Sequence, residues 1–320
     1  MAINSAKTEV EWEQDTALSV DFYNNWFTGY APRVFQETRI TTAEKVKKVM
    51  GWTKNLTDIS AQTLLSHPEI LPTLRMATCP PIARDRLVGL SGAKKSVVDS
   101  MEKNNRVPPQ MKVPELIGHL TLISDVLTKM TDPDIFPWLQ RKDTGSEAEV
   151  EKASTIIADR LCGAEADPII RNAQEKRQLD SMKEWLEARG YRELQLRECD
   201  GFRDMPNGTF SFRLNVPVNQ PDGEQVNIPV DAVIMRMNAM PGDFPALFEA
   251  KSAGDFTNTN KRRKEEAAKM DQLKSTYGAD ITFDLFLCGY FNKTYLKYEK
   301  SHGIDWVWEH RIDDLELFGF

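Results

Sequence analysis

The spacing of the hydrophobic residues changes about halfway along the chain. In roughly the first 140 residues, apolar positions recur every three or four residues, which is the period of an amphipathic helix. The segment 41–52 is an example, because a Thr and a Glu stand near its start and Val46 and Val49 follow at helical spacing. Prolines then divide 59–81 into shorter segments. This half of the chain is therefore predicted to be mostly helical.

A longer helix is predicted where the pattern changes. Asp167 is a suitable N-cap, Pro168 fits the first helical position, and Gly190 ends the segment. The polar and charged stretch 141–152 precedes it and is the best candidate for a linker.

The remaining residues alternate between apolar and polar with a period of two, which predicts β-strands. Strands are expected at 192–199, 209–218, 226–235, 246–252 and 280–291, and a further helix at 258–278. This order describes a mixed sheet with helices on its faces. The predicted fold class is α/β (mixed α+β), with a helical N-terminal region at 1–145 and a second domain at 146–320.

Composition narrows the class of protein. Of the 320 residues, 41% are hydrophobic and 28% charged, as in soluble globular proteins. No apolar run approaches the roughly 18 residues that span a membrane, and the polar, acidic N-terminus is no secretory signal. The four cysteines are far apart, which argues against a zinc site or a disulfide framework and favours the cytoplasm. The net charge of −7 disfavours nucleic-acid binding unless basic residues gather locally.

Charged residues interrupt two of the predicted strands. Asp231 lies inside 226–235, and Glu249 and Lys251 lie in 246–252. Residues two apart on a strand project to the same side, and a neighbouring strand would bring Asp231 to the same place. Two carboxylates at a strand end suit Mg²⁺, and a lysine beside them can orient or deprotonate a water for attack on a phosphodiester. The alternative, a solvated edge strand, does not explain an Asp within an apolar run.

A further carboxylate lies on the predicted helix before the sheet. Leu179, Met182 and Leu186 form an apolar stripe that continues toward the N-terminus through Glu175. Glu175 is either a structural residue that pairs with Arg171 or with a residue of the sheet, or an additional acid near the metal site.

Basic residues gather directly after the second charged strand. Lys261 to Lys264 are four consecutive cations near a helix start, where positive charge opposes the helix dipole. Phosphate contact is the simpler role for this segment, and Arg and Asn side chains can also read base edges. The candidate DNA-binding residues are Asn258, Asn260, Lys261, Arg262, Arg263 and Lys264.

The segment 80–104 has the outline of a helix, a Gly-containing turn and a second helix. It is either a structural hairpin or a DNA-binding helix-turn-helix. Lys94 and Lys95 fall where the DNA-binding version requires a packed residue, so the pattern favours the structural hairpin.

Taken together, these motifs resemble a known family of enzymes. The sequence "PVD" at 229–231 with "EAK" at 249–251 is similar to the PD-(D/E)xK nucleases. The segments "RNAQEKRQL", "KSAGDFTNTNKRRKEEAAK" and "MATCPPIARDRLVGLSG" resemble, more narrowly, type II restriction endonucleases of the XamI-like group. The resemblance touches most of the chain and is strongest over 167–275.

The resemblance implies a restriction-endonuclease-like core that hydrolyses double-stranded DNA. Asp231, Glu249 and the Ala250 carbonyl would hold Mg²⁺, Lys251 would position the attacking water, and Glu175 would stand behind them. Such enzymes usually act as homodimers on palindromic sites, because the symmetry of the protein mirrors that of the DNA. The resemblance also implies a bacterial host with a methyltransferase that protects its own DNA.

Two other functions remain open from the sequence. One is a repair or recombination nuclease of the same fold, although the Gln and Tyr that mark the RecB-like branch are one residue too far apart here, at Gln272 and Tyr277. The other is a non-enzymatic DNA-binding protein that uses the hairpin at 83–103 and would not need Asp231, Glu249 and Lys251.

Overall fold

The computed structural model describes residues 2–194, 199, 201–220, 222–257 and 259–320, with the side chains of 259–262 left out. The chain forms two compact units: Met1–Tyr30 with Ile170–Phe320, which we name the sheet unit, and Ala31–Ile169, which we name the helical unit. The expected boundary lay between residues 145 and 146. The compact units divide instead within two long helices, α1 (Glu9–Trp52) and α8 (Glu147–Ala188).

The helical unit contains the helices predicted for the N-terminal region. Besides parts of α1 and α8 these are α2 (Ala61–Ser66), η1 (Pro68–Ile70), α3 (Leu71–Met76), α4 (Arg84–Ser91), α5 (Lys95–Asn104), α6 (Val113–Met130) and α7 (Pro137–Arg141). Their apolar faces meet in one core that includes the fully buried Leu64, Leu120 and Trp138. The predicted hairpin is α4 and α5, joined through Gly92 in the left-handed conformation, and Lys94 is exposed.

The sheet unit is built on one mixed six-stranded sheet, as predicted. Its strands are β1 (Arg192–Glu193), β2 (Thr209–Asn219), β3 (Gln225–Met235), β4 (Ala246–Ala253), β5 (Phe283–Gly289) and β6 (Trp306–Trp308). They lie in sequence order; β3 is antiparallel to β2 and β4, whereas the β1–β2, β4–β5 and β5–β6 pairs are parallel. The β4–β5 and β5–β6 pairs need crossovers, which α9 (Thr259–Tyr277) and α10 (Lys293–Ser301) supply.

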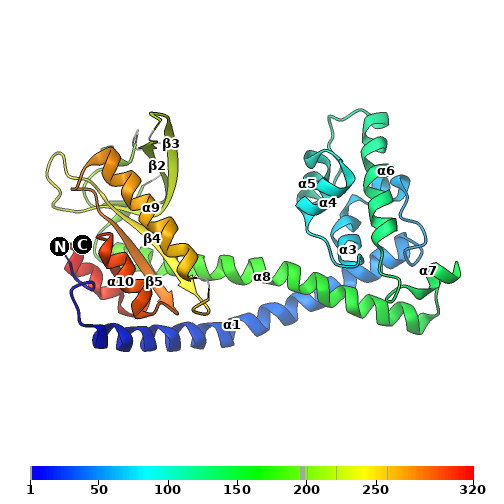
Figure 1. Cartoon of the computed structure of the whole chain (residues 1–320), viewed down its shortest axis with the longest axis horizontal. Helices are drawn as coiled ribbons and strands as arrows, with labels where there is room; N and C mark the ends of the chain where they lie inside the picture. Colours follow the sequence, from blue (N-terminus) through cyan, green and yellow to red (C-terminus); the bar gives the residue numbers. More distant parts are fainter. Residues whose placement is uncertain (1, 195–198, 200, 221, 258) are drawn as a thin grey trace. The chain divides into compact units, whose positions relative to one another are not determined.

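Helices cover both faces of this sheet. On one face, Met270 and Leu273 of α9 and Leu296 of α10 pack against β2 to β5, and Figure 1 shows the two helices over β4 and β5. On the other face, the C-terminal part of α8 packs Met182 and Leu186 against the strands, together with η3 (Glu309–Phe318). Along β2 the period of two is broken at the left-handed Arg213: Phe210 and Phe212 pack on the α8 side of the sheet, whereas Val216 and Val218 pack on the α9 side.

The predicted start of the helix at Asp167 is wrong. The helix α8 begins at Glu147, in the expected linker, and Pro168 lies inside it. Ala153 and Ile157 are buried at helical spacing in the core of the helical unit. Their burial outweighs the hydrogen bond that an internal proline removes.

The strand expected at 192–199 is β1 only at its first two residues, and 195–198 lie outside the described residues. Among the described helices, none combines the length and the apolar character that crossing a membrane requires.

Candidate active site

The strands β3 and β4 separate where Asp231 and Glu249 lie opposite each other. Their register ends at Ala232 and Phe248, and one further step along it pairs Asp231 with Glu249. Oδ2 of Asp231 accepts a hydrogen bond of 2.9 Å from the N–H of Ala250. The carboxylate thus satisfies a backbone donor that lies just beyond the end of the ladder. This explains an aspartate within an apolar strand and confirms the strand pairing on which the prediction depended.

Glu249 and Lys251 project from β4 toward the face that α9 covers. Nζ of Lys251 donates to Oε1 of Glu249 at 2.8 Å, and Nζ of Lys269 on α9 donates to the same oxygen at 2.7 Å. Oε2 of Glu249 is buried and has no hydrogen-bond partner within the described chain. One carboxylate oxygen is therefore doubly neutralised and the other is available to a ligand.

Burial and neighbouring charges raise the pKa values of both Asp231 and Lys251. Burial, and after it the nearby Glu249 carboxylate, raises the pKa of Asp231 to about 6. For Lys251, burial works to lower the pKa, but the Glu249 and Glu266 carboxylates outweigh it and hold the pKa above its usual value. Lys251 is accordingly a charged ammonium at neutral pH, which donates hydrogen bonds and does not take up a proton.

The helix α8 is attached to the site by two glutamines. Nε2 of Gln178 donates to the carbonyls of Lys251, at 3.3 Å, and of Phe286 on β5, at 3.1 Å. One turn earlier, Gln174 donates to the hydroxyl of Ser252. These contacts hold the backbone carbonyl of Lys251 and the side chain of the following Ser252, so a polar face of α8 positions the charged end of β4.

Glu175 lies beside the two carboxylates and is paired with the sheet. Its Oε1 accepts a hydrogen bond of 2.6 Å from Arg213 of β2, and the pair is partly exposed. Arg213 has a left-handed φ of 54°, which is uncommon for a residue other than glycine. It stands opposite Asp231, at a gap between the ladder pairs Phe212–Ala232 and Leu214–Val230.

A pocket of about 380 Å³ joins these groups. It brings together the predicted Asp231, Glu249, Ala250, Lys251 and Glu175, and its other lining residues are Arg171, Gln174, Gln178, Ser252 and Glu265. Gln174, Gln178, Lys269 and Arg213 were not among the residues predicted for the site. The glutamines lie five residues and one residue before Leu179 on the helix already singled out, so their proximity to the apolar stripe was an available signal. No short motif marks Arg213.

Behind Lys251 lies a second pair of carboxyl groups. Oε1 of Glu266 is 3.7 Å from Nζ of Lys251, and its Oε2 accepts a hydrogen bond of 2.6 Å from the hydroxyl of Tyr295. Glu266 and Glu299 are both fully buried and face each other. Burial and the neighbouring Glu266 raise the pKa of Glu299 to about 9, so this pair carries a proton at neutral pH.

The donor set is sparse but suited to a hard cation. Within the described residues, no group of three or more His, Cys, Asp or Glu side chains is arranged as a metal cage. Mg²⁺ is usually bound by one or two carboxylates and completes its shell with water and substrate phosphate. The unpartnered oxygen of Glu249 and the carboxylate of Asp231 fit that requirement.

The basic segment is described only in part. Asn258 lies outside the described residues, as do the side chains of Asn260, Lys261 and Arg262. Of the other two candidates, Arg263 packs over the ring of Tyr298, at 4.8 Å, and Lys264 is exposed.

The chain is similar to known restriction enzymes along almost its whole length. The sequence model of a family described as XamI restriction endonuclease matches residues 54–308. The type II restriction enzyme SalI of Streptomyces albus G is 51% identical over 317 residues, which cover 99% of this chain and 99% of that protein. Among solved structures, protein VC1899 of Vibrio cholerae aligns with 11% identity over 81% of this chain and 55% of its own, and its TM-score of 0.25 supports no argument. The family match spans most of the chain, and the chain belongs to the XamI family of restriction endonucleases.

Proposed function

We propose that this protein is a type II restriction endonuclease that hydrolyses double-stranded DNA at a palindromic sequence, with Mg²⁺ as its cofactor. The observation that carries this proposal is the meeting of Asp231, Glu249 and Lys251 at the point where β3 and β4 separate. The similarity to SalI supports the same conclusion.

Asp231, Oε2 of Glu249 and the carbonyl of Ala250 would hold the metal ion. Bound there, Mg²⁺ would stabilise negative charge on the phosphate and make a water more acidic. Lys251 and Lys269 already occupy Oε1 of Glu249, so the two lysines orient this carboxylate and leave Oε2 free.

Lys251 is assigned to the attacking water and the scissile phosphate. Its ammonium keeps its proton, so it orients the water and donates a hydrogen bond to a phosphate oxygen as charge develops there. Gln178 holds the carbonyl of Lys251 and thereby limits the movement of the lysine backbone. Glu175 is assigned as the additional acid beside this group, held in place by Arg213.

The remaining assignments concern partners. Asn258, Asn260, Lys261, Arg262, Arg263 and Lys264 are proposed to contact DNA, chiefly its phosphates. A homodimer would place two such sites on the two strands of a palindrome. A methyltransferase of the same system would protect the DNA of a bacterial host, in whose cytoplasm the enzyme would act.

A cleavage assay tests the proposal. Purified protein with Mg²⁺ should cut phage DNA into discrete bands. Lys251→Met and Asp231→Asn should each lower the cleavage rate by about 100-fold or more, while Glu184→Gln, an exposed change on α8, should cut like the wild type. Binding of DNA in Ca²⁺ should persist in all three variants.

Other results would decide against this function or this site. Degradation without a band pattern would favour a repair nuclease, and a mobility shift of intact DNA would favour a non-enzymatic binding protein. If Lys251→Met cuts as fast as the wild type, the assignment of Lys251 is wrong.

A further inference from the structure

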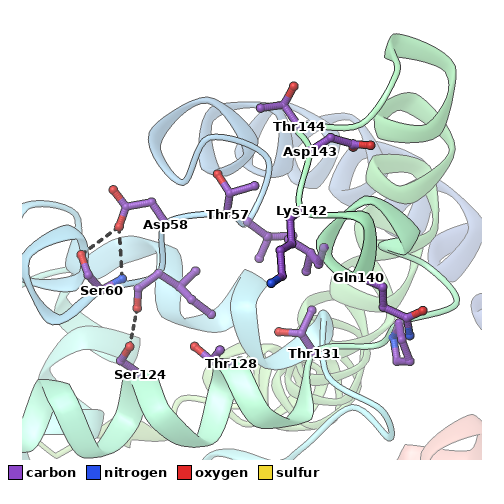
Figure 2. A pocket seen from close by; sticks show the side chains of 14 residues that line it. Thr57, Asp58, Ser60, Ser124, Thr128, Thr131, Gln140, Lys142, Asp143 and Thr144 are labelled. Atoms are coloured by element: carbon purple, nitrogen blue, oxygen red, sulfur yellow. Dashed lines mark hydrogen bonds between the residues drawn. The ribbon is translucent and has the colours of Figure 1, made fainter.

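A second polar pocket lies wholly within the helical unit. It encloses about 850 Å³ between the loop after α1, the C-terminal half of α6, and α7 with the residues that follow it. Figure 2 shows its lining from close by, with hydroxyl groups along α6 and the ammonium of Lys142 directed into the space toward Thr128 and Thr131. A pocket of this size can enclose a ligand as large as a nucleotide.

The walls of this pocket are held by unusual backbone. Lys54, Asn55 and Leu56 are three consecutive left-handed residues, with φ of 49°, 58° and 64°, and Lys142 on the facing wall has φ of 59°. Each such residue costs about 1 kcal/mol or more, and the conformation persists only where its surroundings enforce it.

Hydrogen bonds between the two walls of the pocket hold these residues in the left-handed conformation. Nδ2 of Asn55 donates to the carbonyl of Thr144 at 2.9 Å, and the indole N–H of the fully buried Trp138 donates to the carbonyl of Asn55 at 2.8 Å. The two walls are therefore tied together across the chain, and the pocket is formed without a ligand.

The two acidic residues of the pocket, Asp58 and Asp143, form hydrogen bonds with groups other than Lys142. Oδ1 of Asp58 accepts hydrogen bonds from the N–H and the hydroxyl of Ser60 and from the hydroxyl of Thr63. The hydrogen bond from the Ser60 hydroxyl is the largest cause that lowers the pKa of Asp58, which is about 2. Oδ1 of Asp143 accepts from the N–H of Gly145 at 2.8 Å, and its Oδ2 pairs with Arg141. Neither carboxylate neutralises Lys142.

Lys142 is thus an exposed cation at the pocket without a partner among the described residues. Within the described part of the chain its ammonium makes no hydrogen bond and no ion pair, and neither do the side chains of Thr128, Gln140 and Thr144. By contrast, the hydroxyls of Ser124 and Thr131 donate to backbone carbonyls. The unused groups are one positive charge and several neutral donors and acceptors.

We propose that this pocket binds a nucleotide, with its phosphate on Lys142 and its sugar or base against Thr128, Gln140 and Thr144. Among the apolar lining residues, the half-buried Leu139 offers an apolar contact for a base. The nucleotide is either a unit of the DNA chain, which relies on the proposed function, or a free deoxynucleoside monophosphate, which does not.

The test uses the full-length protein without Mg²⁺, so that binding is separated from cleavage. Lys142→Asn removes the charge and tolerates a left-handed backbone, and Thr128→Val removes the hydroxyl with little change of shape. Lys129→Gln, an exposed lysine of α6 outside the pocket lining, is the matched control. Calorimetry measures the binding of each of the four deoxynucleoside monophosphates, and fluorescence anisotropy measures the binding of a duplex over a range of salt concentrations.

For a free nucleotide, Lys142→Asn should weaken binding about tenfold, because a hydrogen bond to a charged group is lost, and Lys129→Gln should not. For a unit of the DNA chain, Lys142→Asn should lower the slope of log affinity against log salt by about 0.9, the loss of one phosphate contact. If neither measurement distinguishes Lys142→Asn from Lys129→Gln, the proposal is overturned, whereas the cleavage assay above can still succeed.

Discussion

Replacing Glu299 by glutamine should stabilise the sheet unit in a manner that depends on pH. Glu299 is fully buried beside Glu266, and burial and that neighbour raise its pKa from 4.5 to about 9. A glutamate with a raised pKa contributes most to stability below its unfolded pKa, and that contribution is lost as the pH rises toward the folded value. Wild-type stability should therefore fall between about pH 4.5 and pH 9.

The size of the effect follows from this window. At pH 7 the folded protein retains a proton that the unfolded chain has lost. The resulting loss of stability is about 1.4 kcal/mol for each pH unit above 4.5, or at most about 3 to 4 kcal/mol. Glutamine has nearly the same shape, needs no proton, and can donate its amide to Glu266. Glu299→Gln should thus gain up to that amount at pH 7 and almost nothing at pH 4.5.

Urea unfolding followed by tryptophan fluorescence measures this difference, since Trp306 and Trp308 are fully buried in the sheet unit. The exposed Glu184→Gln is the control. Stability curves for Glu299→Gln and the wild type that run parallel from pH 4.5 to pH 9 would refute the assignment of a retained proton to this pair.

Three further outcomes are expected. Because the pKa of Asp231 is about 6, affinity for Mg²⁺ measured by calorimetry should fall up to tenfold for each pH unit below that value, and a flat profile would count against Asp231 as a ligand. Gly289→Ala should unfold the sheet unit, since the new Cβ would lie 2.2 Å from the carbonyl oxygen of Ala253, whereas Gly163→Ala, with open space on α8, should gain about 1 kcal/mol in a urea titration. Arg213→Gly should relieve the left-handed backbone and change stability by less than about 1 kcal/mol, because the lost ion pair is exposed.

That Asp231 lies beside Glu249 and Lys251 could be predicted from the sequence, because the three residues lie on two neighbouring strands. Alternation placed Glu249 and Lys251 on one side of β4, and the fold class and the approximate ends of β2 to β5 followed from the same period. The start of α8 could not be predicted from the local signal. An N-cap and a proline at 167–168 indicate a helix start, but the burial that extends the helix to Glu147 involves residues distant in the sequence.

The contacts that Lys269 and Arg213 make with the site could not be predicted from the sequence either. Lys269 is an ordinary lysine of a charged helix until α9 is placed over β4, and Arg213 is one of several strand residues until its backbone turns left-handed beside Asp231. Neither position has a local pattern, because each role arises from tertiary placement.

The arrangement of the two lysines bears on the proposed binding of a metal ion at this crowded, charged site. Lys251 and Lys269 both donate to Oε1 of Glu249, so their positive charge is concentrated on one oxygen. Had each lysine taken a different oxygen, a cation would have to displace an ammonium before it could bind. Instead Oε2 of Glu249 remains buried and unpartnered, and burial together with the Glu249 carboxylate raises the pKa of Asp231. A dication would satisfy both acids at once, while Lys251 stays in place to meet the water and the phosphate.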